Sequence, residues 1–403
     1  MVQRQFPRWS DLKPYIGLRA PFSGPSAVES AATIADLRHI ARRRTPTAVF
    51  DYVDGAAGAE LSLNRSREAY GRIEFRPHVL RDVVDIDTSR QVLGETWRLP
   101  FGFGPTGFTR MMHHEGEPAV AQVAGEFGIP YTLSTLGTTS AEDLAAAAPD
   151  TRKWFQLYLL KEKQSRADLV RRVADSGYEA IMLTVDTVVA GSRLRDVRNG
   201  LTIPPQLTAR TLAGLARYPR WWGNVLSTPP LEFASLRTTD GTVADLINNV
   251  FDPSVTMADV RWLREHWSGP LIIKGVQNVD DAMMLAHEGV DGILLSNHGG
   301  RQLDRSVVPL ELLPEVRQAV GSEINIFVDG GVMSGADIVA AVAFGATGVF
   351  VGRAYLYGIM AGGEAGVRRV AQILQTEIEQ TMRLMGVQRL EDITPDMVSF
   401  ASS

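Results

Sequence analysis

The sequence predicts an α/β fold, a (β/α)8 or TIM barrel with an N-terminal helical extension and a long insertion after the fourth strand. Apolar runs of strand length alternate along the chain with amphipathic segments that have acidic starts and glycine stops. Eight such repeats imply parallel strands that are buried on both faces and close into a barrel. Because periodicity does not establish closure, an open doubly wound sheet is the alternative fold.

The eight predicted strands are short runs rich in apolar residues. They begin at Pro100, Ile129, Lys153, Ala180, Pro270, Gly292, Ile324 and Gly348. Helices are predicted between them over 165–178, 278–290 and 334–346, among others, and a longer helix over 363–386 follows the last strand. Hydrophobic residues make up 45% of the 403 residues, which is enough for a large core.

Two segments interrupt the regular alternation. Residues 1–99 contain a helical stretch over 33–44 and short strands, which predicts an N-terminal extension packed on a barrel of residues 100–403. After the fourth strand the spacing breaks, and residues 188–256 form an insertion where a connection usually takes about 2–6 residues. A connection of that length is expected to be functional or mobile.

Composition excludes several classes of protein. The absence of cysteine excludes disulfides, thiolate nucleophiles and cysteine-based metal sites. The formal net charge of −5 argues against a nucleic-acid binder, which needs a basic face. The N-terminus lacks the apolar core of a signal peptide, and no uninterrupted apolar run is long enough to span a membrane. We therefore expect a cytoplasmic protein.

The segment "SNHGGRQLD", residues 296–304, follows the sixth predicted strand directly. Barrel enzymes carry their chemistry in the loops at the carboxyl ends of the strands, and these residues lie there. His298 suits general acid or base catalysis, and Arg301 suits a carboxylate or phosphate. A packed histidine followed by a glycine turn is the alternative interpretation.

Other predicted strands also end in polar residues, which would be costly to bury without partners or a ligand. These residues are Gln156, Tyr158, Thr184, Asp186, Lys274 and Asp329. Asp186 could hold the His298 imidazole and stabilise its charged form. No group of histidines and carboxylates has the spacing of a metal site, so we predict no metal and an organic electron or proton acceptor.

These residues give the chain a resemblance to the FMN-dependent α-hydroxy-acid oxidase and dehydrogenase family. Besides "SNHGGRQLD", the family's motifs occur in order as "FDYVDGA", "PTG", "FQLY", "LTVDT", "IIKGV", "DGG" and "GR". The resemblance covers nearly the whole chain. It implies that His298 removes a substrate proton with Asp186 as its partner, and that Tyr158 bonds the substrate hydroxyl. It also implies that Tyr52, Arg193 and Arg301 hold the substrate carboxylate.

The resemblance implies an FMN site as well. The ring would contact Thr106, Gly107, Ser134, Gln156 and Thr184, and Lys274 would lie near its N1, with Ser296 and Asp329 in the same site. A cation near N1 would stabilise the charge that reduction places there. The phosphate would bind at Gly331, Gly352 and Arg353. Many relatives have arginine where this chain has Met333, so the phosphate contact would depend more on Arg353.

The same resemblance suggests that the protein oxidises L-lactate to pyruvate, because Leu136 and Ala190 leave space for a substrate larger than glycolate. Gly107 adds further space, so mandelate-like acids are alternative substrates. The insertion contains Tyr218, Trp221 and Trp222, and residues 193–220 hold six arginines against one acid, Asp196. This composition suits an anionic membrane surface and a quinone acceptor, or else a lid over the site. A peroxide-forming oxidase, a monooxygenase and a non-catalytic binding barrel are the alternatives. We also expect a homo-oligomer, specifically a homotetramer.

Overall fold

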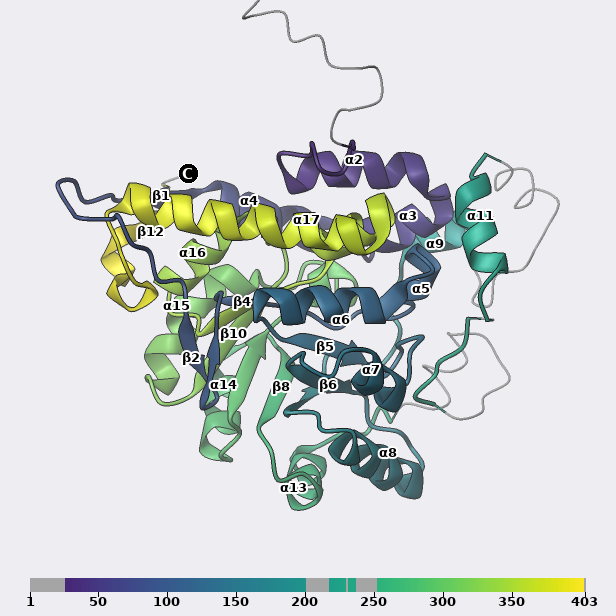
Figure 1. The fold of residues 1–403 in the computed structure, drawn as a ribbon. Coiled ribbons are helices and arrows are strands. Elements are labelled where there is room, and N and C mark those ends of the chain that lie inside the picture. The colour runs from purple at the N-terminus through teal and green to yellow at the C-terminus, as the bar shows by residue number, and fades with distance from the viewer. Residues whose placement is uncertain (1–25, 201–216, 230, 237–251, 402–403) are drawn as a thin grey trace, which may run out of the picture.

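The computed structural model describes residues 26–200, 217–229, 231–236 and 252–401 (Figure 1). Its centre is a closed barrel of parallel strands in the order β10-β11-β4-β5-β6-β7-β8-β9. The strands are β4 (Phe101–Phe103), β5 (Tyr131–Ser134), β6 (Lys153–Leu157), β7 (Ala180–Thr184), β8 (Leu271–Val276), β9 (Gly292–Leu295), β10 (Asn325–Asp329) and β11 (Gly348–Val351). All eight predicted strands are confirmed, and the closure excludes the open doubly wound sheet.

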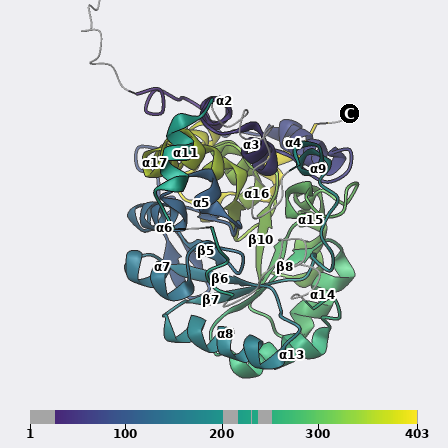
Figure 2. The same cartoon turned by 90° about the vertical axis from the view of Figure 1, so that its right-hand side faces the viewer.

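Helices surround the strands, as Figure 2 shows. They are α5 (Thr109–Met112), α6 (Gly116–Phe127), α7 (Ala141–Ala147), α8 (Lys163–Asp175), α13 (Met257–His266), α14 (Val279–His287), α15 (Pro309–Val320), α16 (Gly335–Ala343) and α17 (Arg353–Met385). The helix predicted over 363–386 begins earlier, at Arg353. Non-helical backbone at Gly362 and Gly363 divides α17 near the point where the prediction placed its start.

Aromatic side chains close the amino-terminal end of the barrel. The hairpin of β2 (Arg90–Val92) and β3 (Glu95–Trp97) covers this end, and Trp97 stacks on Phe327 with ring centroids 5.9 Å apart. Trp97 also contacts Trp154 and Phe350, and all four rings are buried. These buried rings pack against one another at this end, whereas barrel enzymes carry their sites at the carboxyl end of the strands.

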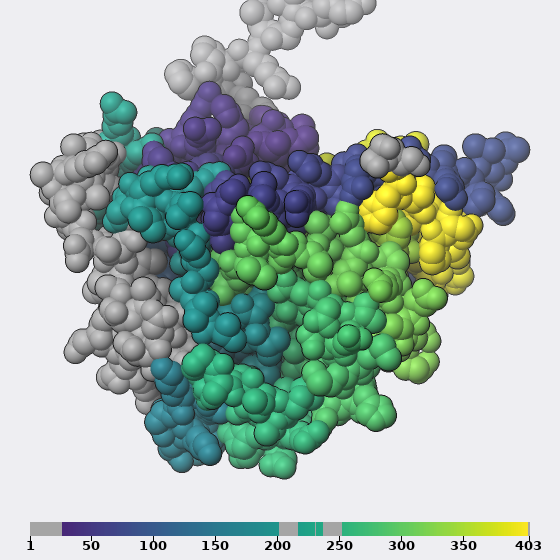
Figure 3. Space-filling view, turned by 180° about the vertical axis from the view of Figure 1, so that it is seen from behind, coloured from purple at the N-terminus to yellow at the C-terminus, as the bar shows by residue number. Residues whose placement is uncertain are grey.

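The N-terminal segment contributes α2 (Ile34–Arg44), α3 (Thr47–Asp54) and α4 (Leu61–Gly71). Helix α2 begins with a capping box at Thr33 and packs along α17 (Figure 1). Strand β1 (Ile73–Phe75) pairs antiparallel with β12 (Val398–Phe400), so the last strand of the described chain lies against the segment that follows α4. Figure 3 shows the C-terminal part, in yellow, at the edge of this face. The division of the chain at residue 99 stays a proposal.

Two short helices are described within the predicted insertion, α9 (Leu194–Asn199) and α11 (Pro219–Leu226). The stretches 201–216 and 237–251 of the insertion lie outside the described residues. Among the residues that the structure describes, no helix is both long and apolar enough to cross a membrane.

Candidate active site

A cavity opens at the carboxyl ends of the barrel strands. Nearly all of the predicted site residues line it. They are Tyr52, Thr106, Gly107, Ser134, Gln156, Tyr158, Thr184, Arg193, Lys274, His298, Arg301, Asp329, Gly331, Gly352 and Arg353. Asp186 and Ser296 lie directly behind this lining and bond to His298. The fold thus brings together every residue that the sequence singled out.

The backbone after β9 turns sharply to present His298. Three consecutive residues, His298, Gly299 and Gly300, have φ of 58°, 62° and 75°. A left-handed histidine is uncommon, and such strain is concentrated at functional sites. The turn is held by Asn297, whose Oδ1 accepts the Gly300 N–H at 3.1 Å, and by Ser296, whose Oγ accepts the His298 N–H at 3.0 Å.

The His298 side chain pairs with Asp186. Its Nδ1 lies 3.1 Å from Asp186 Oδ1, and the Asp186 side chain is only 2% exposed. Burial acts to raise the pKa of Asp186, but the nearby His298 and Lys274 together hold that pKa below its usual range. A charged carboxylate therefore fixes Nδ1 as the protonated nitrogen and leaves Nε2 to accept a proton.

A glycine in β8 makes room for Asp186. Gly275 lies at an irregularity in the β8–β9 register and has φ of 104°. A Cβ added there would lie 2.7 Å from the Cβ of Asp186. The glycine in "IIKG" thus allows the carboxylate to approach the barrel wall closely enough to reach His298.

Two arginines lie over the ring of Tyr52. The guanidinium carbons of Arg193 and Arg301 lie 5.2 and 4.8 Å from the centre of the Tyr52 ring. Arg193 is paired with Asp196 at 3.2 Å, whereas Arg301 has no carboxylate partner among the described residues and donates to the Tyr52 carbonyl. Burial, then the neighbouring Arg193, lowers the pKa of Arg301 to about 10. Arg301 therefore stays charged at neutral pH, and the two guanidinium groups form a site for one anion.

Tyr158 lies beside this pair, at the end of β6. The side chain is buried, and its backbone N–H donates to Thr135 Oγ1 at 3.1 Å. Burial is the main cause that raises the pKa of Tyr158, and the Asp186 carboxylate adds to it. The phenol is therefore neutral at physiological pH and can donate a hydrogen bond into the cavity.

Polar side chains from neighbouring strands form one wall. Gln156 accepts from Ser134 Oγ at 2.8 Å and donates from Nε2 to Thr184 Oγ1 at 3.0 Å. On the facing loop, Thr106 Oγ1 lies 2.5 Å from the Tyr355 hydroxyl. A Cβ on Gly107 would lie 3.1 Å from Leu136 Cβ, so this glycine allows two loops to pack closely.

A buried lysine stands at the end of β8. Lys274 Nζ lies 3.1 Å from Asp329 Oδ2 and donates to Ser296 Oγ at 2.7 Å. The other Asp329 oxygen, Oδ1, is buried without a partner among the described residues. Buried acceptors are nearly always satisfied, so Oδ1 indicates a ligand with a hydroxyl donor at this position.

The ends of β10 and β11 form the last part of the lining. Gly331 has φ of 90°, and a Cβ on Gly352 would meet nothing nearer than Thr106 Cγ2, 3.9 Å away. Arg353 donates from Nε, Nη1 and Nη2 to the carbonyls of Val53, Gly299 and Gly55 at 2.8 to 2.9 Å. Arg353 thus ties α3 to the His298 turn with the donors expected to hold phosphate.

Helix α4 contributes two residues that the sequence did not indicate, Leu63 and Arg67. They are four positions apart and lie beside the buried positions Ser62, Ser66 and Tyr70 of that helix. That spacing is the only sequence signal for them. Gln302 was also missed, and its Nε2 donates to the carbonyl of Asp186 at 3.2 Å.

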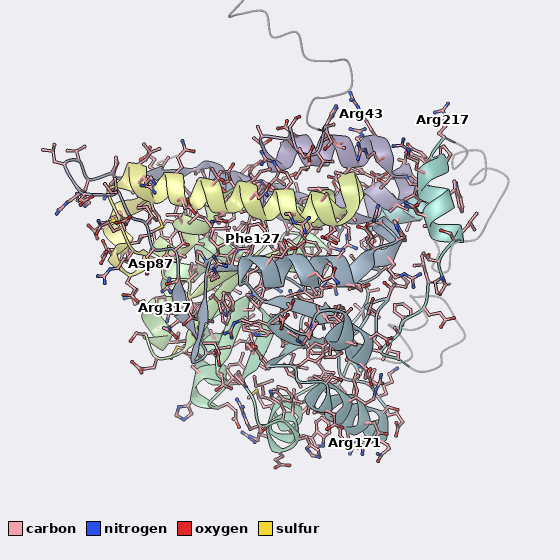
Figure 4. The ribbon with its side chains drawn as sticks, in the orientation of Figure 1. Arg43, Asp87, Phe127, Arg171, Arg217 and Arg317 are labelled. Atoms are coloured by element: carbon pink, nitrogen blue, oxygen red, sulfur yellow. The ribbon has the colours of Figure 1, made fainter. Side chains whose placement is uncertain are left out.

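A second cavity lies next to the first, and Met112 lines both. Its basic lining residues are Arg43, Arg44, Arg217 and Arg220, together with His113 and His114. Figure 4 labels Arg43 and Arg217 at the same end of the molecule, near α11. Trp221 fixes α11 to the barrel because its Nε1 donates to the Met111 carbonyl at 3.0 Å.

Not all arginines of the insertion are free to meet a membrane. Arg193 belongs to the cavity, and Arg195 forms ion pairs with Asp54 at 2.9 Å and Glu60 at 2.5 Å. Arg210 lies outside the described residues. The described surface of the insertion therefore exposes fewer unpaired arginines than the local excess of positive charge in the sequence suggests.

A sequence profile for FMN-dependent dehydrogenases matches residues 41–400. The chain belongs to this family. A Mycobacterium tuberculosis protein named "Putative L-lactate dehydrogenase" is 53% identical over 99% of this chain and 97% of that protein. An L-lactate dehydrogenase of Caulobacter vibrioides is 37% identical over 91% of this chain and 97% of that protein.

Solved structures give the same family and add membrane association among the relatives. A monotopic membrane protein, (S)-mandelate dehydrogenase, superposes with a TM-score of 0.88 at 33% identity and covers 92% of this chain and all of that one. A mandelate oxidase superposes with a TM-score of 0.82 at 36% identity and covers 93% of this chain and all of that one.

Family membership makes FMN the cofactor of this protein, and the cavity suits it. The unpartnered Asp329 Oδ1 provides an acceptor for a polyhydroxylated chain. The open space at Gly352 allows a ligand to approach the backbone, and Lys274 is buried at the same wall. No group of histidines and carboxylates in the described part of the chain could hold a metal ion.

Proposed function

We propose that this protein oxidises an L-2-hydroxy acid, L-lactate, to the corresponding 2-oxo acid, pyruvate, with FMN as the first electron acceptor. One observation carries the proposal: a histidine–carboxylate pair and a pair of arginines face the same cavity. The first pair suits proton removal and the second suits a carboxylate. The names of the relatives add independent support for lactate.

In the proposed reaction Arg193 and Arg301 bind the substrate carboxylate and fix its orientation over Tyr52. Tyr158 donates a hydrogen bond to the substrate hydroxyl. His298 Nε2 accepts one substrate proton, and Asp186 stabilises the imidazolium that results. FMN, when bound, would take up the two electrons and the second proton that the substrate loses. Lactate thereby releases two electrons and two protons to become pyruvate.

The remaining predicted cofactor residues take the other parts of FMN. We assign the ring to Thr106, Gly107, Ser134, Gln156 and Thr184, with Lys274 and its partners Ser296 and Asp329 at the N1 side. Gly331 and Gly352 are assigned to the phosphate. This distribution is supported by the position of each residue in the cavity lining. Leu136 and Ala190 also line the cavity, and we assign them to the substrate end, where they leave room for a side chain such as the lactate methyl.

We propose a quinone or another non-oxygen compound as the second acceptor, reached from an anionic membrane surface on the inner face of the cell membrane. The basic cavity between α11 and His113–Glu115 supports this proposal, because it adjoins the substrate cavity at Met112. The membrane association of the mandelate dehydrogenase neighbour supports it too. A homotetrameric assembly is part of the same proposal.

A visible spectrum of the purified holoprotein tests the reaction. We expect anaerobic L-lactate to bleach the flavin absorbance with formation of pyruvate, and (S)-mandelate to do so more slowly. An intact flavin spectrum with both acids would refute the enzyme and favour a binding barrel. Reoxidation then separates the acceptors: we expect a quinone analogue to act quickly and air slowly. Fast formation of peroxide in air would establish that the protein is an oxidase. Formation of acetate would establish that it is a monooxygenase.

Sedimentation with anionic vesicles tests the membrane proposal. Trp222→Ser should reduce the bound fraction, whereas the exposed Arg171→Gln on α8, far from α11, serves as the control (Figure 4). Trp221 is unsuitable because its indole holds α11 in place. Equal binding of phosphatidylcholine and phosphatidylglycerol vesicles would contradict an electrostatic attraction.

A further inference from the structure

FMN ends in a phosphate dianion, and the cavity has one end suited to it. The first turn of α17 has no side-chain cap, and its N-cap, Gly352, borders open space. Free backbone N–H groups at a helix start attract an anion, and barrels commonly bind phosphate after their seventh and eighth strands. Gly331, after β10, lies at the same end of the cavity.

The neighbouring helix α16 cannot offer the same kind of site. Its N-cap Ser334 accepts from the Asp337 N–H at 3.1 Å, and Asp337 accepts from the Ser334 N–H at 3.1 Å. Glu377 accepts from the Gly335 N–H at 2.6 Å. These amides are already bonded, and two carboxylates beside them would repel a phosphate.

The cations that line the cavity differ in how their donors are used. Lys274 is bonded to Asp329 and Ser296, and Arg353 donates to three backbone carbonyls. Arg193 and Arg301 lie at Tyr52. Met333, which also lines the phosphate end, carries no charge. Two of the five N–H groups of Arg353 remain, so Arg353 can still bind the phosphate. A second cationic contact, which Met333 cannot supply, must come from another residue.

Arg67 on α4 meets this requirement. Its Nη1 donates to the Gly331 carbonyl and lies 3.0 Å from Asp337 Oδ2, which fixes the guanidinium against the loop after β10. Its Nε and Nη2 have no hydrogen-bond partner among the described residues, and its side chain is 40% exposed. The position of α4 is itself fixed, because a Cβ on Gly331 would lie 2.7 Å from the Ser66 carbonyl oxygen.

We propose that Arg67 is a second arginine that binds the phosphate of FMN in this chain, beside Arg353 and in place of the cation that Met333 lacks. The inference rests on FMN being the cofactor and on the phosphate lying at Gly331 and Gly352. It assigns the remaining guanidinium N–H groups of Arg67 to phosphate oxygens, while Asp337 keeps Nη1 in position.

Binding of FMN and of riboflavin to the apoprotein tests the proposal, because only FMN has the phosphate. We expect Arg67→Gln to raise the dissociation constant for FMN by about 10- to 100-fold, the range for loss of a charge-assisted contact, and to change that for riboflavin less than threefold. Arg65→Gln, an exposed arginine of the same helix that does not line the cavity, should change neither. Adding Met333→Arg to Arg67→Gln should restore FMN binding.

Equal weakening of FMN and riboflavin would overturn the proposal and leave Arg67 a role in holding α4. An unchanged preference for FMN in Arg67→Gln would also overturn it. If the unaltered apoprotein binds neither flavin, the cofactor assignment fails instead. Reduction of bound FMN by lactate is measured separately, so a failure of the proposed reaction is distinguishable from a failure at Arg67.

Discussion

Replacement of Asp186 by asparagine tests the pairing on which the proposed chemistry depends. Asparagine has nearly the same shape, so it fits beside Gly275, and its carbonyl can still accept from His298 Nδ1. The negative charge is lost. At the 3.1 Å separation and an effective dielectric of about 20, the charge–charge energy is about 5 kcal/mol. Net losses for a charge-assisted hydrogen bond are smaller, about 1.5–3 kcal/mol.

If this stabilisation is needed when His298 becomes charged, its loss raises the barrier to flavin reduction by the same energy. Each 1.36 kcal/mol corresponds to a factor of ten in rate, so the limiting rate of flavin reduction should fall by about 10- to 100-fold. Anaerobic stopped-flow mixing with saturating L-lactate measures this rate from the flavin absorbance. The variant should keep its FMN. Asp196→Asn is a matched control, because Asp196 pairs with Arg193 rather than with the base. It should alter lactate affinity and leave the limiting rate nearly unchanged.

A limiting rate for Asp186→Asn within threefold of the unaltered protein, with full FMN content, would refute the reasoning. A slow rate combined with lost FMN would contradict it as well, because the carboxylate would then support the fold of the cofactor site. A larger fall of the limiting rate in Asp196→Asn than in Asp186→Asn would indicate that this rate depends more on the carboxylate-binding arginines than on the histidine base.

Three further outcomes are expected. His298→Ala should retain FMN and lose about 10²–10⁴-fold in the rate of reduction by lactate, measured in the same apparatus. Arg301→Lys should raise the dissociation constant for lactate at least tenfold with little change in FMN content, because lysine lacks the paired donors of the guanidinium. Asp54→Asn should lower the Tm at pH 7 by several degrees, because Asp54 is buried and bonded to Arg38, Arg195 and Tyr357. Burial acts to raise the pKa of Asp54, but these three partners outweigh it and lower that pKa. The charged Asp54 therefore stabilises the fold above its unfolded pKa of about 3.9. The difference in Tm between the variant and the unaltered protein should shrink as the pH falls below that value.

The barrel strands could be predicted because their burial leaves a simple signal. Each strand is buried on both faces, as the pattern of β7 and β8 illustrates, so each appears as an unbroken apolar run. Polar residues directly after these runs, such as Asp186 and His298, could then be placed at one rim. The start of α17 could not be predicted, because the glycines that break the helix imitate a boundary.

Contacts between distant segments were beyond prediction from periodicity. The resemblance indicated Tyr52, but nothing in the local pattern of α3 placed its ring beside two arginines from other loops. The hydrogen bonds by which Arg353 connects α3 to the His298 turn could not be predicted either, because its partners are backbone carbonyls of these two segments. Arg67 shows the same limit, since its sequence neighbours give no sign that α4 borders the phosphate end.

The packing of glycines explains why an N-terminal helix belongs to the active site. A Cβ on Gly300 would lie 2.7 Å from the backbone nitrogen of Leu63, and one on Gly331 would lie 2.7 Å from the carbonyl oxygen of Ser66. Two loops, after β9 and β10, thus rest against α4 at positions where no side chain fits. The His298 turn and the phosphate end are therefore positioned by the same helix. A barrel of residues 100–403 alone would lack these contacts, together with Tyr52 and Arg67, so we expect it to form an incomplete site.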